Sequence, residues 1–448
     1  MYVPTQYKGP KVNGALPGPI SQQFLSYQER FESTAITYPK NLPISIRKAS
    51  GSFIEDMDGN VFIDMLSGAG VLCLGHGHPE LISEAKNQLS VLTHGLDFPT
   101  ETKHKFIEKI LDLLPENIKD DMRIHFCGPT GSDAIETAIK IAKAHTGRRE
   151  IISFHGAYHG CTHFTMSLTG LKAPKEQILN TVPGINFFPF PYCLRCPLGL
   201  NKSSCNINCI QYLENVLTDT HGGITCPAAV IIEPIQGEGG SIPANREFFQ
   251  RLRQLTKRLD VPLIVDEIQT GIGRTGSWFA FEHYGIEPDM IVCSKALSGI
   301  GQPISVVLYH SKYVWKKGSH IGTFRGNQIA MACGIKNIEI MRRDDILGHV
   351  NRMSDISFKF LNKAISNNPV VGDIRGKGLM IGIEIVGPND NHPNGVLAKQ
   401  IQKKCLDNGL IVELGGRNDA IIRLLPPLNI TEDVLLQGLQ ILSMAIND

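Results

Sequence analysis

Apolar residues in the middle of the chain fall in short runs that alternate with amphipathic stretches. Five runs rich in β-branched residues predict strands, at 122–128, 150–156, 228–235, 262–267 and 289–297. Between them, apolar residues at helical spacing predict helices at 131–147 and 246–260. Strands that are apolar almost throughout and separated by helices indicate a mainly parallel sheet covered on both faces, in an α/β domain.

The pattern changes after residue 330. Strands are predicted within "GDIRGKGLMIGIEIV" (372–386) and "NDAIIRLLPPLNIT" (418–431), followed by an amphipathic helix at 432–448. Near the other end, "GSFIEDMDGNVFIDM" (51–65) has the features of a hairpin with an Asp-Gly turn. We therefore expect a large domain at 66–330 and a smaller α+β domain, formed by 331–448 with a contribution from 1–65.

Charge and composition narrow the possible partners. The 448 residues include 44 Lys and Arg against 43 Asp and Glu, without a basic stripe or an acidic tail. Nucleic acid and anionic membranes are therefore not expected as partners. The first residues lack the apolar core of a signal peptide, and no apolar run approaches the roughly 20 residues that span a bilayer. The eleven cysteines fit a reduced chain, so a soluble, cytoplasmic protein is expected.

Chemically active side chains lie at the ends of predicted strands. Glu233, Asp266 and Lys295 each end or follow such a strand, and parallel sheets bind ligands at this edge. Asp266 lies in "PLIVDEIQTGIGRTG" (262–276), and a buried carboxylate needs a cation there. The cation could be Arg274 of the chain itself. It could also be the protonated ring nitrogen of bound pyridoxal phosphate, whose electron-withdrawing ring an ion pair maintains.

The chain also has the other groups that pyridoxal phosphate requires. Lys295, in "DMIVCSKALSGIGQP", lies among apolar and small residues that favour a reactive amine. A turn of small residues, "CGPTGSDA" (127–134), leads into a predicted helix whose backbone N–H groups suit a phosphate. Tyr158, in "GAYHG", offers an aromatic ring. Glu233 could bind in the site or could be a structural carboxylate.

These motifs together resemble one family. "VDEIQTGIGRTG", with Lys295 29 positions after Asp266, "IIEPIQGEGG", "GPTGSDA", "AYHG" and "GTFRGNQ" are similar to the class III (ω-amino acid) aminotransferases among the fold-type-I pyridoxal phosphate enzymes. The resemblance covers roughly residues 40 to 430. It implies an α/β large domain with a seven-stranded, mainly parallel sheet, a smaller α+β domain, and a homodimer that shares its active sites. "PYCLRCPLG" and "GTFRGNQIAMACG" are most similar to the subgroup that uses diaminobutyrate.

The resemblance assigns roles to individual residues. Lys295 would be the catalytic residue, holding the cofactor covalently and moving a proton. Asp266 would pair with the ring nitrogen, Gln269 would bind the phenolic oxygen, and Tyr158 would stack on the ring. Thr323 would reach the phosphate from the neighbouring subunit. The full cofactor-binding set that we expect is Thr130, Gly131, Ser132, Tyr158, Glu233, Asp266, Gln269, Lys295 and Thr323.

The family pattern also implies how substrates bind. Arg423, in "AIIRLLPP", would hold the α-carboxylate of 2-oxoglutarate or glutamate in a bidentate fork, and Glu238 would pair with it when an ω-amino substrate binds. Ornithine-type enzymes carry an arginine shortly after the ring-stacking aromatic, and "YHGCTHFT" has none. The donor is expected to be diaminobutyrate, with ornithine, lysine and 4-aminobutyrate as alternatives. A racemase or epimerase on the same scaffold, or a non-catalytic binding module, is also possible.

One cysteine cluster lies outside this scheme. Its members are Cys193, Cys196, Cys205 and Cys209, spaced C-x2-C and C-x3-C. The spacing resembles a four-thiolate zinc or iron–sulfur site. The alternative is a loop of reduced thiols, because the middle spacing is short for a zinc ribbon. Since transamination needs no metal, we expect none, and the four cysteines stay as candidates.

Overall fold

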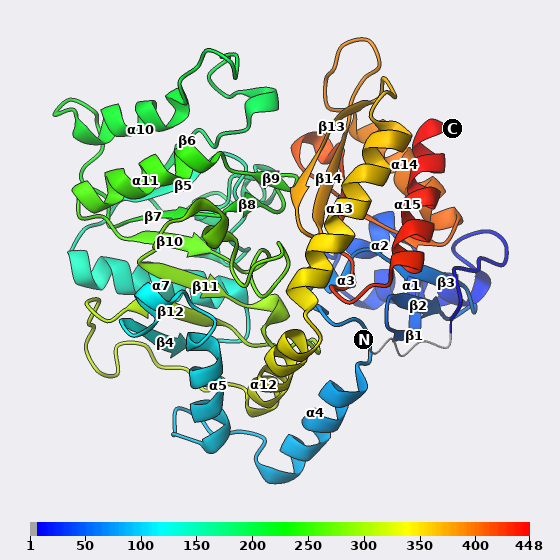
Figure 1. The fold of residues 1–448 in the computed structure, drawn as a ribbon, viewed down its shortest axis with the longest axis horizontal. Helices are drawn as coiled ribbons and strands as arrows, with labels where there is room; N and C mark the ends of the chain where they lie inside the picture. Colours follow the sequence, from blue (N-terminus) through cyan, green and yellow to red (C-terminus); the bar gives the residue numbers. More distant parts are fainter. Residues whose placement is uncertain (1–6) are drawn as a thin grey trace. The chain divides into compact units, whose positions relative to one another are not determined.

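The computed structural model describes residues 7–448, which form two compact units (Figure 1). One unit consists of the chain up to Ser83 together with Ile340–Asp448, and the other consists of Glu84–Glu339. Each unit has its own sheets and its own buried apolar residues. The domain limits expected from the sequence, at 65/66 and 330/331, stay a prediction.

A seven-stranded sheet forms the centre of the 84–339 unit, in the order β4-β12-β11-β10-β7-β5-β6. All of its strands are parallel except β12, which runs antiparallel to both neighbours. This confirms the mainly parallel sheet, although the pattern of the sequence did not predict β6 or β12. The strands are β4 (Met122–Phe126), β5 (Ile151–Phe154), β6 (Ile185–Phe188), β7 (Ala229–Ile232), β10 (Leu263–Asp266), β11 (Met290–Cys293) and β12 (Val306–His310).

Helix α7 (Gly131–Thr146) follows β4 and packs against β7, β11 and β12. The apolar positions that predicted it, Ile135 and Ala138 among them, are fully buried. Gly147 ends the helix in the left-handed conformation, with φ of 66°. The other helices and the small hairpin of this unit are α5 (Glu101–Leu111), α6 (Glu116–Lys119), α8 (His163–Leu168), α9 (Ala173–Glu176), α10 (Asn208–Thr218), α11 (Arg246–Arg258), β8 (Ile235–Gln236) and β9 (Ile242–Pro243).

The other unit has two four-stranded sheets. The first confirms the predicted hairpin, since β2 and β3 pair antiparallel; it comprises β1 (Ile46–Ser50), β2 (Phe53–Asp56), β3 (Val61–Asp64) and β15 (Leu410–Ile411). The second, in the order β13-β14-β17-β16, comprises β13 (Val371–Lys377), β14 (Met380–Ile385), β17 (Ile421–Leu424) and β16 (Glu413–Gly415). Its helices are α1 (Pro19–Phe31), α2 (Tyr38–Asn41), α3 (Ser67–Gly70), α13 (Ile346–Ile365), α14 (Gly395–Asp407) and α15 (Glu432–Asn447). Helices α4 (Pro79–Val91) and α12 (Gln328–Arg343) each cross a limit between the units.

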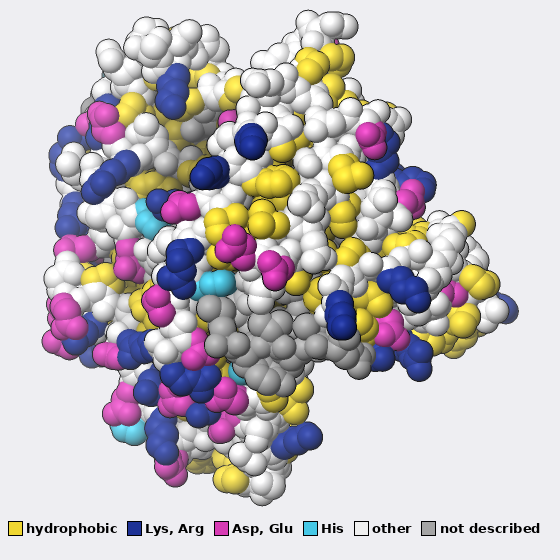
Figure 2. All heavy atoms as spheres, turned by 45° about the vertical axis from the view of Figure 1, so that its right-hand side comes forward, with side chains coloured by type: hydrophobic (Ala, Val, Ile, Leu, Met, Phe, Trp, Pro, Cys, Tyr) yellow, Lys and Arg dark blue, Asp and Glu magenta, His cyan; other side chains and the backbone are white. Residues whose placement is uncertain are grey.

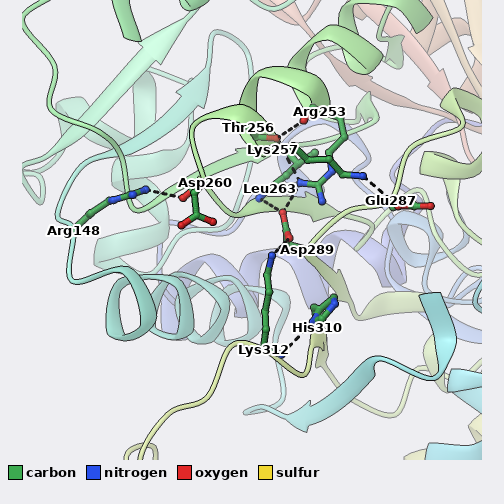
Figure 3. A network of polar contacts seen from close by, with 10 residues as sticks. All are labelled: Arg148, Arg253, Thr256, Lys257, Asp260, Leu263, Glu287, Asp289, His310 and Lys312. Carbon is green, nitrogen blue, oxygen red and sulfur yellow. Dashed lines mark hydrogen bonds and ion pairs between the residues drawn. The ribbon is translucent and has the colours of Figure 1, made fainter. Parts of the chain in front are cut away.

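A buried carboxylate fixes the amino-terminal edge of the seven-stranded sheet (Figure 3). Asp289 precedes β11 and accepts a hydrogen bond from the Leu263 backbone N–H of β10, at 3.0 Å. Two cations neutralise it: Arg253, through Nη1 at 2.5 Å, and Lys312, through Nζ at 3.3 Å. This network holds the starts of β10 and β11 in register, so that their carboxyl ends lie side by side at the opposite edge.

Basic and acidic side chains are interspersed on the face drawn in Figure 2, as the near-zero net charge predicts. Within residues 7–448, none of the helices combines the length and apolar character needed to cross a bilayer.

Candidate active site

A cavity of about 190 Å³ lies where β7, β10 and β11 end. It belongs entirely to the 84–339 unit. The structure brings to its wall eight residues that the sequence singled out: Gly131, Ser132, Tyr158, Glu233, Glu238, Asp266, Gln269 and Lys295. They lie at or after the ends of five strands, β4, β5, β7, β10 and β11, as expected for a ligand site at the carboxyl edge of a parallel sheet.

Asp266, the last residue of β10, is 4% exposed. Its Oδ1 accepts a hydrogen bond from the Ile268 backbone N–H at 3.0 Å, and its Oδ2 lies 2.8 Å from Nδ1 of His159. The side chain of His159 is itself fully buried, and its Nε2 has no hydrogen-bond partner within residues 7–448. The protein thus supplies Asp266 with a histidine, which carries a charge only when protonated.

Glu233 fixes the loop that carries Tyr158. Its two carboxylate oxygens each accept a backbone hydrogen bond at 3.0 Å, from Tyr158 and from Gly237. Burial raises the pKa of Glu233 to about 7, against the effect of nearby His159. These contacts support the structural alternative for Glu233, and its position in the cavity wall leaves room for a direct role as well.

Sequence reasoning missed Glu267, the second acid of "VDEIQ". It is 1% exposed, and it accepts hydrogen bonds from the backbone N–H of Phe281 at 2.8 Å and from the Thr270 hydroxyl at 2.5 Å. Burial raises its pKa to about 7. These hydrogen bonds hold the loop after β10 in its conformation. In the sequence, the position of Glu267 beside Asp266 at the end of a buried strand could have indicated this role.

Lys295 follows β11 in a short 3₁₀ turn, Lys295–Leu297, and adopts φ of 39°. A left-handed lysine is strained, and strain of this kind concentrates at functional sites where neighbouring contacts enforce it. The enforcing contacts flank it on both sides. The Ser294 hydroxyl donates to the Ile304 carbonyl at 2.9 Å, and the Asn337 amide donates to the Ala296 carbonyl at 3.1 Å.

The start of α7 forms another part of the wall. Thr130 caps the helix in a reciprocal pair with Asp133, and the N–H groups of Gly131 and Ser132 come next in the first turn, where α-helices leave donors for other acceptors. Space here is tight: a Cβ added at Gly160, where φ is 121°, would lie 2.0 Å from the Ser132 hydroxyl. A side chain at position 160 would therefore fill the end of the cavity beside the start of α7.

Three predicted residues lie elsewhere. Thr130 is exposed and lies outside the cavity wall, and Thr323 is exposed in the segment before α12. Arg423 belongs to the other unit, where it is fully buried on β17 and its Nη2 lies 2.6 Å from Oε2 of Glu413 on β16. Its pairing with Glu238 stays a prediction, because the two residues lie in different units.

The chain belongs to the class III aminotransferases, because it matches the family model "Aminotransferase class-III" over residues 36–446. It is 44% identical over 419 residues to the diaminobutyrate–2-oxoglutarate aminotransferase of Rhizobium meliloti, covering 91% of this chain and 89% of that protein. It is 40% identical to the protein of the same name from Haemophilus influenzae, with 92% of each chain covered. Among solved structures, a Bacillus anthracis aminotransferase superposes with a TM-score of 0.86 at 28% identity, covering 97% of this chain and 100% of that one. These matches confirm the resemblance and the fold expected from the motifs.

The cofactor of this family is pyridoxal 5′-phosphate, and the cavity fits it. Gln269 lines the cavity, and its Oε1 is buried without a hydrogen-bond partner among the described residues. A hydrogen-bond donor on a bound ligand would satisfy this oxygen. A lysine, a strand-end carboxylate and a helix start lie around the same space. These are the groups that the cofactor's aldehyde, ring nitrogen and phosphate require.

Proposed function

We infer that this protein transfers the terminal amino group of L-2,4-diaminobutyrate to 2-oxoglutarate, giving aspartate 4-semialdehyde and glutamate in a reversible reaction. One observation carries the inference: over nine-tenths of the chain is similar, at 44% and 40% identity, to relatives that bear this activity in their names. The residues around the cavity at the carboxyl edge of the sheet would supply the chemistry that such a transfer needs.

The chain's own residues divide the work at this cavity. Lys295 would hold the cofactor and then move the proton between the substrate carbon and the cofactor. Asp266, held by His159 at 2.8 Å, would keep the ring nitrogen protonated. Gly131 and Ser132 would hold the phosphate, Tyr158 would cover one ring face, and Glu233 would keep the Tyr158 loop in place. The bound cofactor supplies the aldehyde that accepts the amino group and the electron-withdrawing ring.

Substrate recognition is proposed to rest on Arg423. The planar guanidinium of this fully buried residue matches a bidentate grip on the α-carboxylate of 2-oxoglutarate or glutamate. Glu413 already pairs with this arginine inside its own unit, so a dicarboxylate has to compete with that carboxylate. Glu238 would act on the same arginine from the cavity wall during the half-reaction of the diamine.

We further propose a homodimer in which Thr323 reaches the phosphate in the neighbouring subunit. Large apolar side chains stand exposed around Thr323, among them Ile321 at 89% and Phe324 at 71%. His94 lies against Phe324 with ring centroids 5.7 Å apart, and Phe98 is 69% exposed. An apolar surface of this kind favours burial against another protein surface. The eleven cysteines, none of which forms a disulfide among the described residues, support the cytoplasm as the compartment.

A donor panel tests the proposed function. Purified protein is incubated with 2-oxoglutarate and, in turn, diaminobutyrate, ornithine, lysine and 4-aminobutyrate, and glutamate formation is measured. We expect the highest kcat/KM with diaminobutyrate and no glutamate from Lys295→Ala. A higher kcat/KM with ornithine or 4-aminobutyrate would refute the substrate assignment. Loss of chirality at the donor's Cα without a keto acid would instead identify an isomerase.

A further inference from the structure

The segment between β6 and α10 is long and nearly irregular, yet it gathers four thiols. Between Phe188 and Asn208 its one regular element is the 3₁₀ turn Cys193–Arg195. A cavity of about 50 Å³ lies inside this segment, and its wall includes all four cysteines of the cluster, Cys193, Cys196, Cys205 and Cys209. Irregular loops of this length are uncommon in compact domains unless something orders them.

The backbone brings the two cysteine pairs to the same cavity. Cys193 begins the 3₁₀ turn and Cys196 directly follows it. Cys205 precedes α10 and Cys209 lies in its first turn, while Asn206 and Ile207 between them adopt φ of 45° and 55°. Two successive left-handed residues without glycine are unfavourable, and this bend turns both cysteines toward the cavity.

These thiols differ from the buried cysteines of the chain. Cys73, Cys127, Cys293, Cys333 and Cys405 are buried inside the fold, as cysteines that only pack usually are. The four loop cysteines are half-buried, they share one cavity, and within the described chain its wall contains neither histidine nor a carboxylate. The wall thus offers soft thiol ligands alone, in the C-x2-C and C-x3-C spacing typical of structural zinc sites.

We propose that Cys193, Cys196, Cys205 and Cys209 bind one Zn²⁺ ion that orders the 189–209 loop. Each thiol gives its proton to the solvent and the four thiolates surround the ion with no redox change. Lys202, which also lines the cavity, compensates for part of the double negative charge of the centre. Within residues 7–448, no three metal-binding side chains are placed close enough to hold a metal ion. Zinc binding therefore requires the two cysteine pairs to move together, to Zn–S distances of about 2.3 Å, which closes the cavity.

Metal analysis of the purified full-length enzyme tests the proposal. Zinc per chain is measured by plasma mass spectrometry for the wild type, Cys196→Ser, Cys205→Ser and the control Cys226→Ser. Cys226 is an exposed cysteine outside the loop, so its replacement reproduces the chemical change without touching the site. We expect about one zinc ion per chain in the wild type and in the control, and about a tenth of that or less in the two loop variants.

A second measurement does not depend on the variants folding. Titration of the wild type with a mercurial reagent should release the zinc as four thiols react, with a chromophoric chelator reporting the released ion. Cobalt substitution should give red d–d bands of a tetrahedral thiolate site, well away from the cofactor's absorption. Absence of stoichiometric zinc in the wild type, equal zinc in all variants, or a mass deficit that shows a disulfide in the loop would each overturn the proposal.

Discussion

Two buried aspartates sit at opposite edges of the same sheet. Asp289 lies at the amino edge, between Arg253, Lys312 and the Leu263 N–H (Figure 3). Asp266 lies at the carboxyl edge, against His159 and one backbone N–H, in the wall of a cavity. Both are about 4% exposed, so burial does not distinguish them. They differ in their partners and in the empty space beside them.

The partners separate a structural carboxylate from a functional one. Burial pushes the pKa of Asp289 up, but the Arg253 guanidinium and the hydrogen bonds outweigh it, so that the pKa lies below its ordinary value. Two cations and the hydrogen bonds of the network neutralise Asp289. Asp266 instead contacts a histidine and lines a cavity, which is why we propose that it acts on a bound ring. A strand-end acid is therefore best judged by the cations already around it.

Replacing Lys295 should have the largest effect on the carboxyl edge. Lys295→Ala removes the amine that we propose holds the cofactor and moves the proton, so we expect kcat to fall by about 10³-fold or more. Steady-state kinetics with diaminobutyrate and 2-oxoglutarate would measure it. A variant that keeps a tenth of the wild-type rate would exclude Lys295 as the catalytic amine.

Asparagine substitutions at the two aspartates should separate rate from stability. Asp266→Asn should lower kcat by roughly 10²- to 10⁴-fold, because the cofactor ring would lose the group proposed to keep its nitrogen protonated. The melting temperature of Asp266→Asn, measured on the same preparation, should stay close to that of the wild type. Equal losses of kcat in Asp266→Asn and in Asp289→Asn would break the comparison.

Asp289→Asn should mainly destabilise the fold. Removing one partner of a buried ion pair leaves Arg253 unneutralised, at a cost of about 3 kcal/mol in the free energy of unfolding. Denaturant titration measures this cost, while kcat per bound cofactor should stay near the wild-type value. Unchanged stability would show that the network in Figure 3 contributes nothing at this edge.

The two edges should also respond oppositely to pH. Asp289 has a lowered folded pKa, so its contribution is present above the ordinary aspartate pKa and is lost as pH falls through the folded value. Glu233 has a pKa raised to about 7, so between the ordinary glutamate value and about pH 7 the folded state binds more protons and stability falls as pH rises. The melting temperature of Glu233→Gln minus that of the wild type should therefore increase as the pH rises across this range. A constant difference would contradict the assignment.

The smallest effect concerns the proposed substrate end. Glu413→Gln removes the charge that competes for Arg423, so KM for 2-oxoglutarate should fall by about fivefold, or about 1 kcal/mol. Glu384→Gln is the matched control, because Glu384 pairs with Arg375 at 2.6 Å in the same sheet. A similar change of KM in both variants would indicate a general loosening of the sheet.

The sequence predicted most of the parallel sheet and the wall of the site, for a physical reason. Buried strands are apolar throughout, and their ends are marked by the polar groups Glu233, Asp266 and Lys295. Strands β6 and β12 were missed, although β12 is an apolar run like the others, and their places in the sheet depend on pairing with strands distant in sequence. The His159–Asp266 and Arg423–Glu413 pairs were missed for a similar reason, since each joins residues that only the fold brings together.

The central claim is that the carboxyl edge of the sheet holds the cofactor between Asp266 and Lys295. Reduction of the purified holoenzyme with borohydride, followed by peptide mass spectrometry, tests it most directly. We predict a phosphopyridoxyl group on the peptide that contains Lys295, at about one per chain in wild type and in Asp289→Asn. A label on another lysine, or none, would contradict the account.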